Sequence, residues 1–158
     1  MKTIRFKQQR VPSILDGSTT VFRRPINGDI AANFDWDIND KDYIYYEDDY
    51  GDSHHAKELS KYQVGDIVEI MTNKKTGILL KITDVRVERL YPINYGELLK
   101  EGAPNRNKKQ PNALINAVKW FEKHWNEIYE DKGYEVKTNP WVFVYEFEVL
   151  SETTTAAD

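Results

Sequence analysis

Apolar and polar residues alternate over residues 141–149, close to the end of the chain. The large apolar residues at every second position are Trp141, Phe143, Tyr145, Phe147 and Val149. A period of two is typical of a β-strand with one buried face. The opposite face is apolar at Val142 and Val144 and acidic at Glu146 and Glu148. The pattern therefore predicts a strand that is covered on both faces at its start and on one face at its end.

Further segments with strand patterns precede this one. They cover residues 2–8, 18–24, 67–71 and 78–90. The last two are joined by turn residues at 73–77, which predicts a hairpin. Within the second strand of this hairpin, the apolar positions change face at Thr83 and Asp84. Such a change indicates a bulge or a sharp bend, so we expect the sheet to curl.

Helical patterns are fewer and mostly short. Residues 11–15 predict a single turn, and residues 95–100 predict a short amphipathic helix. The one long helix is expected to start at Pro111 and to end near Gly133. Its apolar stripe is formed by Leu114, Val118, Phe121, Trp125 and Ile128. The elements together predict an α+β fold, in which a small, curled, mostly antiparallel β-barrel carries one long helix and one or two short helices.

The length of 158 residues predicts a single domain that covers residues 1–150. Residues 29–60 are rich in acids and aromatic rings, and they are expected to form an insertion on the domain surface. Residues 151–158 contain no large apolar side chain, so we expect a flexible tail. No repeat and no second domain is expected.

Charge and composition limit the function. A net charge of −4 argues against a protein that coats nucleic acid through overall electrostatics. The segment that ends at Arg24 is nevertheless basic, and a second basic patch lies at residues 106–109, so a local cationic site is expected. The chain has no cysteine, no apolar run that could span a membrane and no signal-peptide pattern. We therefore expect a cytoplasmic protein without a membrane partner.

Several short motifs follow one another with a characteristic order and spacing. They are the segments 14–20, 23–25, 64–67, 81–90, 101–102, 133–134, 139–142 and 146–148, together with Trp125. In this arrangement the chain resembles the ASCH domains of the PUA-like superfamily, and in particular their phage and prophage branch. The resemblance implies a barrel with a cleft that binds RNA or a nucleotide.

Some members of the resembled family are enzymes that hydrolyse modified cytidine through a lysine, a threonine and a glutamate. By position, the resemblance places the lysine at Thr19 and the threonine at Phe22, and it retains the glutamate as Glu101. Amide hydrolysis needs a nucleophile that is held against a base. These three residues cannot form such a pair, so we predict that the chain lacks this hydrolase activity. The leading hypothesis is a non-enzymatic module that binds RNA or a nucleotide.

The predicted ligand-binding residues are Ser18, Thr19, Thr20, Arg23, Arg24, Lys81 and Glu101. Gly17 allows a tight turn, the hydroxyl groups that follow offer donors, and a guanidinium can bind a phosphate through two hydrogen bonds. Neighbouring residues of a strand point to opposite faces, so only one of Arg23 and Arg24 can line a cleft. Both could instead be solvated surface charges, and Lys81 could lie on the outward face of the sheet.

Two other functions remain open. The acidic, aromatic segment 29–60 could bind a protein partner, since its acids would repel RNA. A ribonuclease or another hydrolase could use Arg23, Lys81 and Glu101. Neither a metal nor a cofactor is expected, because the adjacent histidines at positions 54 and 55 lack the spacing that would bring them to a common metal. Trp125 and Trp141 are expected to pack in the core rather than to stack on bases.

Overall fold

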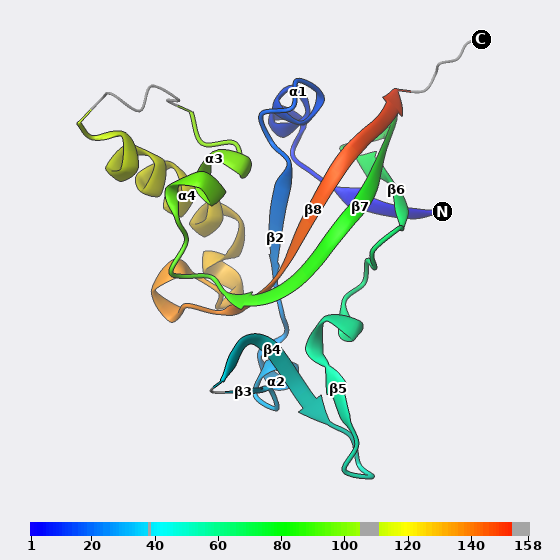
Figure 1. Cartoon of the computed structure of the whole chain (residues 1–158). Coiled ribbons are helices and arrows are strands. Elements are labelled where there is room, and N and C mark those ends of the chain that lie inside the picture. The colour runs from blue at the N-terminus through cyan, green and yellow to red at the C-terminus, as the bar shows by residue number, and fades with distance from the viewer. Residues whose placement is uncertain (38, 105–110, 153–158) are drawn as a thin grey trace.

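The computed structural model describes residues 1–37, 39–104 and 111–152. The main sheet contains β1 (Lys2–Arg5), β2 (Val21–Pro25), β6 (Ile67–Met71), β7 (Lys75–Arg89) and β8 (Trp141–Glu152). The order across this sheet is β1-β6-β7-β8-β2, and of its pairs β1–β6 is parallel while the others are antiparallel. Figure 1 shows β7 and β8 as two long, curved ribbons that give the sheet the shape of a half-barrel. The predicted curled, mostly antiparallel α+β fold is confirmed.

The bend predicted in β7 lies where the sequence places it. The pairing of β7 with β8 changes register between Ile82 and Asp84, because Thr83 is an extra residue on β7. A bulge of this kind reverses which residues face the core. Ile82 before it and Val85 after it are therefore both buried in the same apolar cluster.

The helices are α1 (Val11–Leu15), α2 (Gly28–Ala31), α3 (Tyr95–Lys100) and α4 (Ala113–Tyr129). Short 3-10 turns cover Gln8–Arg10, Ala56–Leu59, Glu130–Lys132 and Val136–Thr138. The helices α1 and α3 have the predicted limits. After α4, Gly133 adopts a left-handed φ of 84° and ends the helical region, as expected. None of the described helices is both long enough and apolar enough to cross a membrane.

The buried face of α4 differs from the predicted stripe at its start. Leu114, which was expected in the core, is 53% exposed. The buried residues are Ala113, Ala117, Phe121, Trp125 and Tyr129, which are four positions apart. Residues with this spacing form one ridge of a helix, and Ala117 of this ridge shares a cluster with Leu98 of α3. The prediction placed the large Leu114 in the core, whereas the small Ala117 allows α4 to approach α3.

Apolar clusters cover both faces of the main sheet. On one face, Phe22 stacks on Tyr145 with 4.8 Å between ring centroids. On the other face, Val142 and Val144 are fully buried in the cluster that contains Phe121 of α4. The start of β8 is therefore covered on both sides, as its pattern predicted.

The acidic segment between β2 and β6 forms a small sheet of its own. Its strands are β3 (Asp35–Asp37), β4 (Asp40–Glu47) and β5 (Ser53–His55), in the order β3-β4-β5. Phe34, Ile44 and Ala56 are buried in one apolar cluster, against which Trp141 of β8 packs. Side-chain packing therefore holds the insertion against the half-barrel (Figure 1).

The end of β8 extends beyond the predicted domain limit. Ser151 and Glu152, which were assigned to the flexible tail, pair with Leu79 and Ile78 of β7. Main-chain pairing needs no apolar side chain, so the polar composition of these positions concealed it. Residues 153–158, and the basic patch at 106–109, lie outside the described residues.

Candidate functional site

The consecutive arginines of β2 point to opposite faces of the sheet. Arg23 pairs with Val144 and Arg24 with Phe143 in the ladder to β8, so they alternate as neighbours on a strand must. Arg23 is 3% exposed and faces α3. Arg24 lies over the rings of Phe6 and Phe22, at 5.1 and 4.8 Å from their centroids. The two guanidinium groups therefore belong to separate sites.

Arg23 binds two carboxylates, one within α3 and one on the residue that follows it. Its Nη1 donates to Glu101 Oε2 at 2.8 Å, and its Nη2 donates to Glu97 Oε1 at 2.9 Å. Glu88 of β7 is a third, more distant partner at 3.8 Å. Arg23 Nε is buried without a hydrogen-bond partner among the described residues. Arg23 and Glu101, which were both predicted as ligand-binding residues, thus form an internal ion pair.

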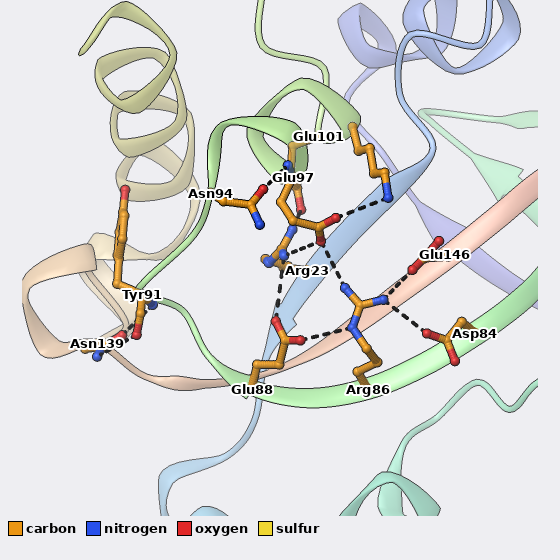
Figure 2. A network of polar contacts seen from close by, with 11 residues as sticks. Arg23, Asp84, Arg86, Glu88, Tyr91, Asn94, Glu97, Glu101, Asn139 and Glu146 are labelled. Atoms are coloured by element: carbon orange, nitrogen blue, oxygen red, sulfur yellow. Dashed lines mark hydrogen bonds and ion pairs between the residues drawn. The ribbon is translucent and has the colours of Figure 1, made fainter. Parts of the chain in front are cut away.

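Arg86 of β7 extends this cluster toward solvent, as Figure 2 shows. It binds Asp84 at 3.1 Å, Glu88 at 3.0 Å and Glu97 at 2.9 Å, and it also contacts Glu146 of β8. Lys100 adds a contact to Glu97 at 3.3 Å. We call this set the polar network: Arg23, Asp84, Arg86, Glu88, Glu97, Lys100, Glu101 and Glu146. Its five carboxylates outnumber its three cations.

Burial and neighbouring charge act in opposite directions within the polar network. Burial raises the pKa of Glu101, although Arg23 opposes this effect. Burial also acts on Glu97, but there Arg23, Arg86 and Lys100 prevail and lower its pKa. For Arg86, burial disfavours the charged form, yet hydrogen bonds to its carboxylates raise the pKa above its ordinary value. The arginines of the network are thus neutralised by the protein itself.

The residues of the glycine turn form hydrogen bonds inside the protein, Thr19 through its side chain and Ser18 and Thr20 through their backbone N–H groups. Thr19 is buried, and its Oγ1 lies 2.8 Å from Ser13 Oγ and 3.4 Å from the Glu101 carbonyl oxygen. The backbone N–H of Ser18 donates to Asp16 Oδ1 at 2.8 Å, and that of Thr20 donates to the Lys100 carbonyl oxygen at 2.8 Å. These contacts join the turn to α3 and stabilise the site.

Two other residues singled out in the sequence lie apart from Arg23 and Glu101. Lys81 is exposed on β7, opposite Glu148 of β8 and Ile67 of β6. Phe22 is 1% exposed, in the apolar cluster on the opposite side of the sheet. Neither side chain lies close enough to join the polar network, so the seven predicted residues do not form one site.

Arg24 borders a groove of about 780 Å³ between the N-terminal segment, β2 and the end of α4. We call it the cationic groove and define it by its basic lining residues, Arg5, Lys7, Arg10, Arg24, His124 and Lys132. The remaining lining residues are uncharged. Within the described part of the chain, no carboxylate forms an ion pair with any of the five arginines and lysines.

The two half-buried arginines of the cationic groove are held in place by neutral groups. Arg24 Nη2 donates to the Arg5 carbonyl oxygen at 3.0 Å, and Arg10 Nη2 donates to the Glu101 carbonyl oxygen at 2.7 Å. Burial lowers the pKa of Arg10; Glu101 opposes this effect and Arg24 adds to it. An arginine keeps its charge at neutral pH despite such shifts. The groove therefore holds fixed positive charges that repel one another.

The sequence indicated part of this groove. The basic composition of the first 24 residues pointed to Arg5, Lys7 and Arg10, although none was singled out as a binding residue. Lys132 and His124 carry no local signal, because α4 and the turn after it bring them to the groove from more than 100 residues away. The carboxylates around Arg86 could have been noticed as alternating charges along β7.

The fold is similar to two solved structures. One is an ASCH domain from Lactobacillus crispatus, with a TM-score of 0.53, 12% sequence identity, and coverage of 90% of this chain and 70% of that one. The other is protein EF3133 from Enterococcus faecalis, described as DUF984, with a TM-score of 0.59, 10% identity, and coverage of 100% and 86%. No protein-family model and no curated protein matches the sequence. The chain has the ASCH-domain fold; a phage or prophage origin stays a prediction.

Proposed function

We propose that this protein is a non-enzymatic module that binds single-stranded RNA or a nucleotide through phosphates in the cationic groove. The observation that carries the proposal is the set of five positive side chains with no carboxylate among them, in a protein whose net charge is −4. Phosphate groups would supply the missing negative charge, and arginine binds phosphate through paired N–H groups. The ASCH-domain fold supports a role of this type.

The surroundings of Arg24 suit a phosphate better than those of Arg23. A phosphate near Arg23 would have to displace Glu97 and Glu101, and other carboxylates of the polar network would repel it. Arg24 is held by two rings and a carbonyl group, none of which is negatively charged. Its guanidinium is therefore both fixed and available, which lowers the entropy lost on binding.

The size of the groove favours a short contact with a nucleic acid. A volume of about 780 Å³ fits a few nucleotides rather than a long duplex. Outside the groove, the excess of acidic residues gives no broad attraction for a polyanion. We expect contacts to about three phosphates, so that log K falls with log salt with a slope of about −2.

The non-enzymatic part of the proposal rests on the residues at the family's catalytic positions. Thr19 is buried and bonded to Ser13, Phe22 is packed in the core, and the carboxylate of Glu101 is bound by Arg23. A nucleophile and a base must approach the same substrate atom. We infer that the chain does not hydrolyse acylated cytidine.

The proposal is tested by titrating a labelled single-stranded RNA of about eight nucleotides, and in parallel uridine monophosphate, at several salt concentrations. Affinity should fall as salt rises, and Arg24→Gln should weaken binding about tenfold, because it removes a charged hydrogen bond to phosphate. Lys7→Gln, at an exposed position of the same groove, should weaken it less.

Two controls separate charge from folding. Arg24→Lys keeps the positive charge but loses the paired N–H groups, so its affinity should lie between those of Arg24→Gln and the unchanged protein. Lys81→Gln removes an exposed cation outside the groove and should leave the affinity unchanged. Salt-independent binding, or equal affinity of Arg24→Gln, Lys7→Gln and the unchanged protein, would contradict the proposal.

A further inference from the structure

A second hollow, of about 720 Å³, lies between the insertion and the part of β7 that follows its bulge. We call it the aromatic groove and define it by Trp36, Asp84, Glu88, Arg89 and Trp141. None of these residues lines the cationic groove. Its volume lies within the range of sites for small organic molecules, roughly 300–1,000 Å³.

Two indole rings form the apolar part of the aromatic groove. The ring centroids of Trp36 and Trp141 are 6.2 Å apart and their planes are inclined by 43°. The edge of Phe34 supports Trp141 at 6.0 Å, and the Arg89 guanidinium lies 4.5 Å from its centroid. Trp36 is 57% exposed, although it is the largest apolar side chain of β3. An exposed indole beside a hollow is typical of a binding surface.

Polar atoms that can form further hydrogen bonds lie on β7 beside these rings. Asp84 and Glu88 each bind Arg86 through one oxygen, Oδ2 at 3.1 Å and Oε2 at 3.0 Å. Among the described residues, Asp84 Oδ1 accepts no hydrogen bond, and Glu88 Oε1 has the 3.8 Å contact to Arg23 as its ion pair. Arg89 donates through Nη1 to the Asn139 carbonyl oxygen at 3.1 Å, which leaves its other N–H groups for a ligand.

We propose that the aromatic groove binds a nucleobase. A planar ring can stack on the exposed indole of Trp36, because every base has a π-face. Carboxylate oxygens accept hydrogen bonds from exocyclic amino groups, and an arginine donates to carbonyl or ring nitrogen acceptors of the same base. Lys57, Arg86 and Arg89 also line this groove and offset the two carboxylates, so its exposed indole ring and its mixed donors and acceptors favour the base over the phosphate.

The inference goes beyond the proposed function, because a nucleoside carries no phosphate and binds with the cationic groove empty. Bases that bear an amino group satisfy the free oxygens of Asp84 and Glu88. Uracil has no amino group and leaves them unpaired. Cytidine and adenosine should therefore bind more tightly than uridine.

The test is a calorimetric or NMR titration of the whole protein with cytidine, adenosine and uridine. We expect binding of the first two that does not change with salt, and a loss of about fivefold or more in Trp36→Ala, since stacking on an aromatic ring is removed. Trp36→Phe should recover part of the loss. Tyr50→Ala, which removes a 91% exposed ring elsewhere in the insertion, should leave binding unchanged.

The outcomes distinguish this site from the cationic groove. Arg24→Gln should not alter nucleoside binding, so salt-independent nucleoside binding supports the aromatic groove even if phosphate binding fails. Absence of nucleoside binding, or equal binding by the unchanged protein and a folded Trp36→Ala variant, would overturn the inference. Binding of an aromatic peptide through Trp36, without binding of nucleosides, would overturn it as well and assign the groove to a protein partner.

Discussion

Arg23 and Arg24 are identical residues at consecutive positions, yet they lie in opposite electrostatic surroundings. Arg23 is buried in the polar network, where Glu97 and Glu101 neutralise it. Arg24 borders the cationic groove, where rings and a carbonyl group hold it without cancelling its charge. The comparison shows that residue type and location on a strand do not tell whether an arginine is neutralised by neighbouring carboxylates. The two arginines differ in whether carboxylates of the protein already neutralise their charge.

The comparison assigns the two arginines different contributions to stability. We expect Arg23→Met to lower the free energy of unfolding by about 3–5 kcal/mol, because it leaves carboxylates without their partner in a buried site. Arg24→Met should cost about 1 kcal/mol, mainly through lost contacts with two rings. Urea denaturation of both variants measures the difference. Similar losses would show that the two environments are not energetically distinct.

A double variant separates the loss of the attraction between Arg23 and Glu101 from the cost of a buried carboxylate without a partner. In Arg23→Met/Glu101→Met, the carboxylate that has lost its partner is removed together with the arginine. The double variant should be more stable than the sum of the two single losses predicts. Simple additivity would contradict a direct coupling between these side chains.

Two glycines with a positive φ can be compared in the same way, because one lies in crowded surroundings and the other does not. Gly102 has a φ of +108°, and an added Cβ would lie 2.4 Å from Thr19 Oγ1. Gly17 has a φ of +83°, but its Cβ would meet no atom within 4 Å. We expect Gly102→Ala to cost about 3 kcal/mol and Gly17→Ala about 1 kcal/mol, since both introduce backbone strain but only the first adds a clash. Thermal unfolding midpoints should follow the same order.

The smallest effect is expected in the insertion, at a partly exposed contact between His54 and Asp48. His54 Nε2 lies 2.8 Å from Asp48 Oδ2, and this hydrogen bond raises the pKa of His54. A raised histidine pKa adds stability below about pH 6.5, and this stability is lost as the pH rises through the raised value. Asp48→Asn should lower the pKa of His54 in an NMR titration. Asp49→Asn, at the adjacent exposed acid, should leave it unchanged.

Local patterns were sufficient to predict most of the fold. The period-two alternation identified β8, and the phase change at Thr83 placed the bulge that curls the sheet. Leu114 was assigned wrongly, because helical spacing alone cannot tell which of two adjacent rows contacts a neighbouring helix. Packing between α3 and α4 decided this, and it depends on the tertiary structure.

The candidate sites were less predictable than the fold. Strand alternation predicted that Arg23 and Arg24 would separate, but not which of them would meet the carboxylates of α3. The cationic groove needs Lys132, and the aromatic groove needs Trp36 next to Trp141. Such pairs are brought together from distant parts of the chain, so no local spacing records them.

The insertion is hydrogen-bonded as a separate three-stranded sheet and shares no strand pairing with the half-barrel among the described residues. Its amino acids can therefore diverge without disturbing the ladder of the five main strands. Because Trp36 comes from this segment while Arg24 comes from the main sheet, the aromatic groove can change without a change in the cationic groove. Homologues that differ chiefly between β2 and β6 would then carry a different aromatic groove on an unchanged half-barrel.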